Sequence, residues 1–185
     1  ILALEDIDFD NLPDSSSNLW VTHHRYRHAP PTYIESLIRL KDGNGNQVPP
    51  NLFLPSAERF GLMSRIDLWV VRNALQILQE AHDLGLPFTL GINLSAITLE
   101  DEQAISQILD HIKDSPIPSR HLAIEITERN AITNMAGVKS FVERINQLGC
   151  QFALDDFGAG FSSFAQLRHL PVKYVKIDGE YISSM

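Results

Sequence analysis

Oxygen-bearing side chains stand within or at the ends of several apolar segments of this chain. They are Glu35, Asn93, Glu125, Asp155 and Asp156. An acid inside an apolar segment is costly unless it is paired or binds a metal. A set that offers only carboxylate and amide oxygens suits Mg²⁺ or Mn²⁺ rather than zinc. Two adjacent aspartates could serve two metal ions at once, which is the arrangement used for in-line phosphoryl displacement.

A cation and a further acid end the last apolar segment, as Lys176 and Asp178. The ammonium could orient an attacking water or neutralise charge that develops in a transition state. Asp178 could be a neighbour of the metal ligands or a cap of the next helix. Each of these residues taken singly could also be an ordinary ion-pair partner. Their recurrence on successive segments favours one shared site.

Strand-like and helix-like segments alternate along the chain and must position these side chains. The periodicity predicts strands over 19–22, 33–40, 88–94, 122–127, 150–156 and 174–178, and helices over 66–84, after Thr98 and after Asn134. Residues 41–50 predict a turn-rich loop. Apolar strands that alternate with helices are typical of a parallel sheet covered by helices. Polar residues at the strand ends, without a Gly-rich phosphate loop, favour a (β/α)8 barrel over an open doubly wound sheet.

Composition limits the possible classes of protein. The chain has 44% hydrophobic and 21% charged residues, which is ordinary for a globular domain. Its net charge of −8 argues against a DNA partner, because duplex binding needs basic patches. The single cysteine, Cys150, is expected to fill the core, and the lack of disulfides agrees with a cytoplasmic location. Acidic and Ser-rich residues 1–17 predict a linker or domain edge before a domain over 18–185.

Five segments together resemble the EAL domain family, which acts on cyclic di-GMP. Glu35-Ser36-Leu37 stands where the family has its Glu-Ala-Leu signature. The others are FLPSAERFGLM (53–63), INLS (92–95), IEITE (124–128) and DDFGAGFSSFAQLRHLPVKYVKID (155–178). Their order and spacing match the family from about residue 33 to the end of the chain. The resemblance implies a TIM-like (β/α)8 barrel that hydrolyses cyclic di-GMP to linear pGpG with one or two Mg²⁺ or Mn²⁺ ions.

The resemblance also implies roles for single residues. By position, the metal ligands are Glu35, Asn93, Glu125 and Asp155, with Asp156 at a second metal. Lys176 and Glu35 are the expected catalytic residues. Arg39 and Asp178 are expected to bind substrate, Arg39 through its planar fork of donors. Glu128 is expected to anchor the loop that begins at Asp156, and the region 156–163 is expected to form a homodimer contact.

Two features depart from the family pattern. Residues 19–26, LWVTHHRY, lack the glutamine that the family carries in its first strand. The chain also stops at Met185, after the sixth expected strand. We therefore expect the last two strand–helix units to be missing, with open sheet edges and unburied apolar faces. By itself the chain is expected to be unstable and to show no appreciable turnover.

Three functions stay open for the complete protein. The intact set of acids favours a cyclic di-GMP phosphodiesterase. The altered first strand favours an inactive cyclic di-GMP receptor or a signalling and dimerisation module. A scaffold that binds only protein partners would leave the acids and Arg39 without a role. The resemblance further implies an adjoining sensory or diguanylate-cyclase-like domain, which could tether the parent protein to the inner membrane.

Overall fold

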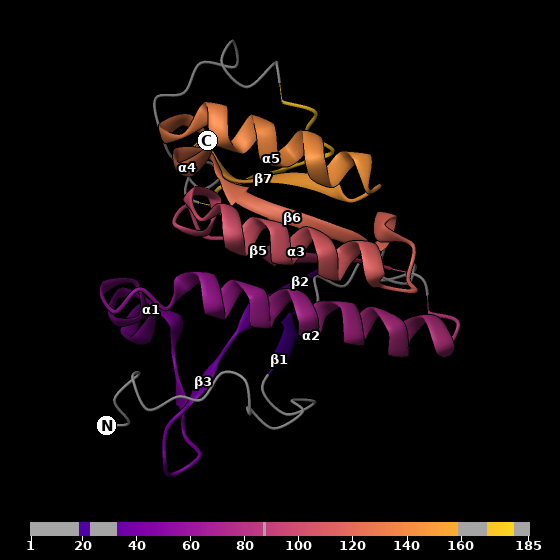
Figure 1. Ribbon diagram of the computed structural model, residues 1–185. Coiled ribbons are helices and arrows are strands. Elements are labelled where there is room, and N and C mark those ends of the chain that lie inside the picture. The colour runs from indigo at the N-terminus through magenta and orange to yellow at the C-terminus, as the bar shows by residue number, and fades with distance from the viewer. Residues whose placement is uncertain (1–18, 23–32, 87, 159–169, 180–185) are drawn as a thin grey trace.

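The computed structural model describes residues 19–22, 33–86, 88–158 and 170–179 (Figure 1). One sheet has the strand order β1-β2-β5-β6-β7-β8. Its strands are β1 (Leu19–Thr22), β2 (Tyr33–Ile38), β5 (Thr89–Asn93), β6 (Leu122–Thr127), β7 (Gln151–Phe157) and β8 (Tyr174–Ile177). The helices are α1 (Pro50–Arg59), α2 (Met63–Asp83), α3 (Glu102–Asp114), α4 (Glu128–Thr133) and α5 (Met135–Gln147). The six strands and the three long helices lie close to the ranges predicted from periodicity.

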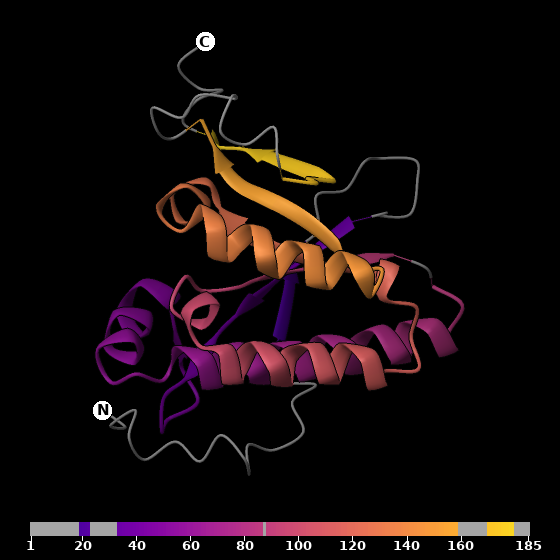
Figure 2. The same cartoon turned by 45° about the horizontal axis from the view of Figure 1, so that its top comes forward.

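The sheet is curled, with α2, α3 and α5 side by side on its outer face (Figures 1 and 2). Strands β2, β5, β6, β7 and β8 run parallel to one another. The rings of Tyr33 on β2 and Tyr174 on β8 have centroids 4.7 Å apart. In a flat sheet those strands would lie about 19 Å apart, at roughly 4.8 Å per strand. The curvature confirms the predicted barrel architecture, of which these strands form a part.

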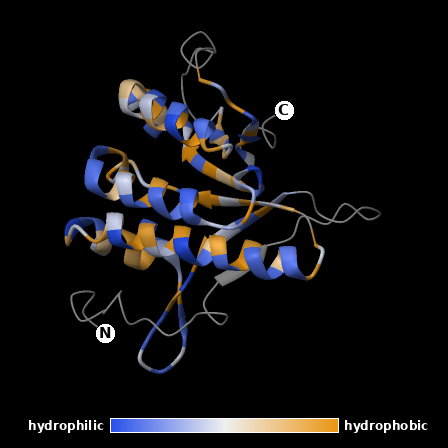
Figure 3. Ribbon diagram, turned by 45° about the vertical axis from the view of Figure 1, so that its right-hand side comes forward, coloured by the Kyte–Doolittle hydropathy of each residue, from blue (hydrophilic) through white to orange (hydrophobic). Residues whose placement is uncertain are grey.

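Apolar residues fill the space between the sheet and its helices. The strand residues Leu90, Ile92, Ile124, Ile126 and Leu154 are buried there. Their helical partners in the core include Val71, Ala74, Ile108, Val142 and Ile145. The hydropathy colouring shows largely apolar strands and a hydrophilic hairpin below them (Figure 3). Cys150 is buried with this cluster, so its predicted role in the core is confirmed.

Local sequence signals set the ends of the helices. Asp101 begins α3, where its side chain accepts a hydrogen bond from the Ala104 amide at 3.0 Å. Asn134 does the same for α5 by accepting from the Gly137 amide, as predicted. After α5 the chain turns at Gly149, whose φ of 90° few other residues adopt. Strand β7 can therefore return directly under α5.

The first strand pair differs from the parallel sheet that the sequence predicted. Strand β1 is antiparallel to β2, with Leu19 opposite Ile38 and Thr22 opposite Glu35. The connection between them, residues 23–32, is shorter than a parallel crossover needs. An antiparallel pair is therefore the arrangement that this spacing allows.

Residues 40–59 contain more regular structure than the expected loop. Strands β3 (Leu40–Lys41) and β4 (Gln47–Val48) pair as a hairpin that projects away from the sheet (Figure 1). In its turn, Asp42 Oδ1 accepts hydrogen bonds from the backbone amides of Asn44 and Asn46. Helix α1 follows with Pro50 in its first turn, a position that suits proline. The periodicity of the sequence does not predict this helix.

Strand β8 ends the sheet among the described residues. The outward side chains Val175 and Ile177 are 50% and 54% exposed, in line with the expected unburied apolar face. In the described part of the chain, no helix combines the length and apolar character needed to cross a membrane. The predicted linker 1–17 and residues 159–163 of the expected dimer loop lie outside the described residues.

Candidate functional site

The concave face of the sheet carries the polar side chains. Glu35 on β2 lies opposite Gly91 on β5, and Asn93 on β5 lies opposite Glu125 on β6. Thr127 on β6 lies opposite Asp155 on β7. Side chains at paired positions of parallel strands point to the same face of the sheet. Four successive strands, β2, β5, β6 and β7, therefore bring their polar residues to one surface.

Lys176 lies at the centre of this surface. Its Nζ lies 2.9 Å from Glu35 Oε2, 2.6 Å from Glu125 Oε2 and 3.1 Å from Asp155 Oδ2. These partners lie on β2, β6 and β7, so the Lys176 ammonium contacts carboxylates on both sides of the curled sheet. When all four groups are ionised, one ammonium offsets one of the three carboxylates and a formal charge of −2 remains.

The same three carboxylates could hold a cation. One oxygen each from Glu35, Glu125 and Asp155 lies within 4.8 Å of the others. Asn93 Nδ2 donates to Glu35 Oε1 at 3.0 Å, which leaves the amide oxygen of Asn93 for another partner. An all-oxygen donor set with excess negative charge fits Mg²⁺ or Mn²⁺. Of the predicted ligands, the structure thus brings four together.

Burial shapes the electrostatics at Glu125, whose side chain is 0% exposed. Burial raises the pKa of this carboxyl group, and the hydrogen bonds from Lys176 and Tyr33 act against that rise. Burial alone would lower the pKa of Lys176. Its hydrogen bonds and charge interactions with Glu125 and Glu35 outweigh burial, so the pKa lies above its usual value. Lys176 is therefore an ammonium at neutral pH.

Asp156 lies beside the three-carboxylate group rather than within it. The pairing of β7 with β8 is irregular between Leu154 and Phe157, and Asp156 has a φ of 54°. Such a left-handed bulge costs free energy and is frequent next to functional sites. Burial and the charge of Asp155 raise the pKa of Asp156, with Asp178 as a further contributor. The bulge thus keeps a second acid electrostatically coupled to the site.

The remaining predicted residues follow the carboxyl ends of strands that carry this cluster. Arg39 follows β2, and its Nη1 donates to the Ile38 carbonyl at 2.9 Å. Asp178 follows β8, and its backbone amide donates to the Phe157 carbonyl at 3.1 Å. The buried Glu128 begins α4, where its Oε2 accepts from the Gly158 amide at 3.1 Å. Glu128 therefore contacts the segment that the sequence predicts it to anchor.

Two contributors to the site were not predicted from the sequence. Tyr33 donates its hydroxyl proton to Glu125 Oε1 at 2.7 Å. Its only sequence signal is its place on β2, two residues before Glu35 and on the same face. Asp67 lies on the buried side of α2, and its Oδ2 accepts from the Ser95 amide and hydroxyl and from the Thr98 hydroxyl. This contact holds the turn that follows Asn93.

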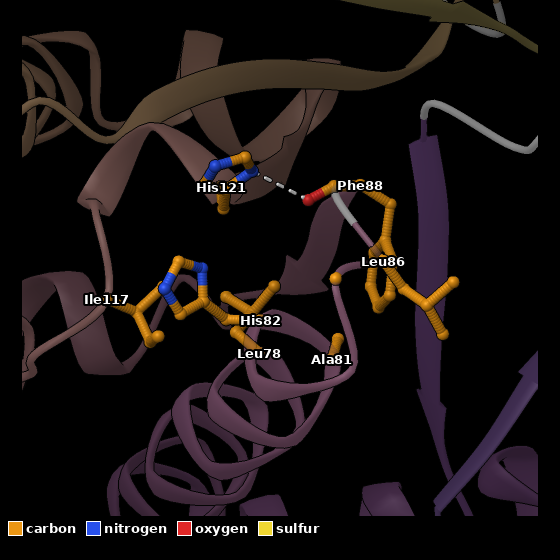
Figure 4. A pocket seen from close by; sticks show the side chains of 8 residues that line it. Leu78, Ala81, His82, Leu86, Phe88, Ile117 and His121 are labelled. Atoms are coloured by element: carbon orange, nitrogen blue, oxygen red, sulfur yellow. Dashed lines mark hydrogen bonds between the residues drawn. The ribbon is translucent and has the colours of Figure 1, made fainter.

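A cavity of about 250 Å³ lies at the other end of the strands, between α2 and the starts of β5 and β6 (Figure 4). Leu78, Ala81, His82, Gly85, Leu86, Phe88, Ile117 and His121 line it. The Nδ1 of His121 donates to the Phe88 carbonyl at 2.9 Å. None of the predicted site residues borders this cavity, so the acidic cluster is the stronger candidate for chemistry.

Comparison with known proteins gives consistent matches. A family model described as EAL domain matches residues 23–185. The chain is 35% identical over 153 residues to cyclic di-GMP phosphodiesterase PdeF of Escherichia coli K12, covering 83% of this chain and 20% of that protein. It is 39% identical over 152 residues to cyclic di-GMP phosphodiesterase PdeB of Shewanella oneidensis, covering 82% and 18%.

A solved structure agrees with these sequence matches. The FimX EAL domain of Pseudomonas aeruginosa, bound to c-di-GMP, superposes with a TM-score of 0.75 and 31% identity. The match covers 83% of this chain and 62% of that one. The chain thus spans about a fifth of the two curated relatives and less than two thirds of the solved domain.

Proposed function

This chain belongs to the EAL domain family, and we propose that the complete protein hydrolyses one phosphodiester bond of cyclic di-GMP to give linear pGpG. The observation that carries the proposal is the convergence of Lys176 with the carboxylates of Glu35, Glu125 and Asp155. Curated relatives at 35% and 39% identity are named as cyclic di-GMP phosphodiesterases.

In this proposal a bound divalent cation, Mg²⁺ or Mn²⁺, would polarise a water and offset the charge of the phosphate. Glu35, Glu125, Asp155 and the amide oxygen of Asn93 would hold one ion, and Asp156 would face a second. The excess negative charge of the cluster supports this assignment, because one lysine cannot neutralise three carboxylates.

Lys176 and the surrounding side chains would carry the protein's part of the reaction. The Lys176 ammonium would hold the attacking water and offset charge on the phosphorane-like transition state. The water oxygen forms a bond to phosphorus as the bond from phosphorus to one ribose oxygen breaks, and the proton that the water loses is balanced by the proton that the leaving ribose oxygen gains. Asn93 donates to Glu35 Oε1 and so limits the rotation of that carboxylate. Arg39 and Asp178 would contact the substrate outside the reacting centre.

The loop after Asp156 would complete the site. Glu128 accepts a hydrogen bond from Gly158, the last described residue before that loop. We therefore assign Glu128 as its anchor and propose that region 156–163 takes part in a homodimer contact. As part of the same proposal, an adjoining sensory or diguanylate-cyclase-like domain regulates the activity in the cytoplasm.

The second candidate function is a receptor that binds cyclic di-GMP without hydrolysing it. The missing glutamine in residues 19–26 favours it, because the family contacts its substrate there. The related FimX EAL domain is described as bound to c-di-GMP. A receptor would use the same surface for binding and transmit the signal through its neighbouring domain.

Product analysis separates these functions. The natural full-length protein is incubated with cyclic di-GMP and Mn²⁺ or Mg²⁺, and pGpG is quantified by anion-exchange chromatography. The phosphodiesterase should form pGpG, Glu35→Ala should abolish it, and Asp42→Ala on the exposed hairpin should not affect it. Tight nucleotide binding without product would establish the receptor instead. The absence of both would leave only a protein scaffold.

A further inference from the structure

The contact between Tyr33 and Glu125 crosses a whole strand of the sheet. Tyr33 belongs to β2 and Glu125 to β6, with β5 between them. The Tyr33 hydroxyl nevertheless lies 2.7 Å from Glu125 Oε1. The Tyr33 ring packs edge-on against Tyr174 of β8, at an interplanar angle of 67°. Contacts with β6 and β8 thus fix both the hydroxyl and the ring.

Gly91 on the intervening strand leaves the room for this contact. A Cβ atom at Gly91 would lie 2.5 Å from the Tyr33 hydroxyl oxygen and would overlap Glu125 Oε1. Gly91 has no positive φ, so space and not backbone conformation is the reason for glycine here. The neighbouring inner-face residues Ala123 and Ala153 are also small. Tyr33 therefore lies in a gap formed by small residues on the adjacent strands.

The two oxygens of Glu125 consequently have different partners. Oε1 accepts the Tyr33 hydroxyl, whereas Oε2 faces Lys176 at 2.6 Å. The side chain is 0% exposed, so no bulk water competes for either oxygen. Rotation of the carboxylate would break one bond or both, and an unpaired buried oxygen is costly. The orientation of Glu125 is therefore determined by Tyr33 from one side and by Lys176 from the other.

We infer that Tyr33 is a positioning residue of the site, which holds Glu125 so that only Oε2 is presented to a bound cation. The inference rests on the proposed function, because it takes Glu125 as a metal ligand. Hydrogen bonds behind a ligating carboxylate are a common means of setting its orientation. Tyr33 would act without touching the substrate or the metal.

The affinity for Mn²⁺ tests this inference without an activity assay. We would measure the dissociation constant for Mn²⁺ in the full-length protein from the electron paramagnetic resonance signal of free Mn²⁺. Tyr33→Phe keeps the ring and removes only the hydroxyl, and it should weaken binding by about tenfold or more. Tyr174→Phe removes the hydroxyl of the other ring in the same pair and should leave the affinity unchanged.

The results for these variants and for the wild-type protein distinguish a failure of the positioning role from a failure of the phosphodiesterase proposal. Unchanged Mn²⁺ affinity in Tyr33→Phe, or an equal loss in Tyr174→Phe, would overturn the positioning role. Gly91→Ala, which crowds the same contact, should also weaken binding if it folds. Wild-type protein that binds Mn²⁺ but forms no pGpG would defeat the phosphodiesterase proposal and leave the role of Tyr33 intact. Wild-type protein that does not bind Mn²⁺ would overturn both.

Discussion

Lys176 on β8 and Glu125 on β6 form an ion pair of 2.6 Å across the intervening strand β7. The pair exists because the sheet curls, and the same ammonium reaches Glu35 on β2 at 2.9 Å. A buried charge without its partner costs much more than the intact pair contributes. Lys176 is therefore a structural requirement of the cluster as well as its expected catalytic residue.

Lys176→Met should lower the free energy of unfolding, because three facing carboxylates lose their only direct cation among the described contacts. Breaking such a pair costs about 3–5 kcal/mol when it is fully buried, and the partial exposure of Lys176 favours the lower end. Lys173→Met, at a nearby exposed position, is the matched control. Urea unfolding at neutral pH measures both variants. Equal stability of the two would contradict the role given to Lys176, whereas added Mn²⁺ should restore part of the loss.

Glu128→Ala should destabilise the segment after Asp156, because the Gly158 amide loses its carboxylate acceptor. The cost of the lost hydrogen bond is about 1.5–3 kcal/mol for a charged acceptor. Glu128→Gln keeps the shape and one acceptor oxygen, so its loss should be smaller. Hydrogen exchange at Gly158, followed by mass spectrometry, reports on this bond directly. Equal exchange protection in wild type and Glu128→Ala would show that Glu128 does not hold the segment.

Most residues of the site could be predicted from the sequence, because their identification depends on strand periodicity and on the position of polar residues within the strands. A polar residue within an apolar strand indicates which face of the sheet carries the site. Parallel strands in register bring such residues together on that face. Glu35, Asn93, Glu125, Asp155 and Lys176 followed from this reasoning. The family motif added Glu128, whose contact with Gly158 no local pattern indicates.

Other features could not be predicted from the sequence, because they depend on how the strands and side chains are arranged in three dimensions. The contact of Tyr33 with Glu125 needs a curled sheet and the room beside Gly91, and neither can be deduced from an alternating pattern. The left-handed conformation of Asp156 depends on an irregular pairing of β7 with β8. The antiparallel pairing of β1 with β2 does follow from the sequence, because the connection between them is too short for a parallel crossover.

Asp67 should make stability depend on pH in a defined direction. Burial raises the pKa of this carboxyl group above its ordinary 3.8, although Ser95 and Thr98 donate to it. A carboxyl with a raised folded pKa contributes stability below its unfolded pKa and loses it as pH rises through the folded value. Relative to wild type, Asp67→Asn should therefore gain stability as pH rises from about 4 toward neutral.

Urea unfolding of both proteins across this range measures the effect of Asp67. Asp83→Asn, at an exposed position on the same helix, serves as the control for a charge change without burial. A difference between wild type and Asp67→Asn that does not change with pH would show that the carboxyl is not desolvated in the folded protein.

Cys150 should resist alkylation while the protein is folded. Its side chain is buried, and burial raises the pKa of the thiol from 9.0 to about 12. Since only the thiolate is nucleophilic, iodoacetamide at pH 8 should modify Cys150 only after the chain opens. Mass spectrometry should detect slow modification in buffer and rapid modification in urea. Rapid modification of the folded protein would contradict this assignment.

The same shift in pKa predicts a loss of stability at alkaline pH. The unfolded chain ionises its thiol near pH 9, whereas the folded protein retains the proton up to about pH 12. The contribution of Cys150 to stability is therefore complete below pH 9 and declines as pH rises toward 12. Cys150→Ala removes this titration, so its stability should fall less steeply than that of wild type over the same range. Parallel alkaline declines in urea unfolding would show that the thiol is ionised equally in both states.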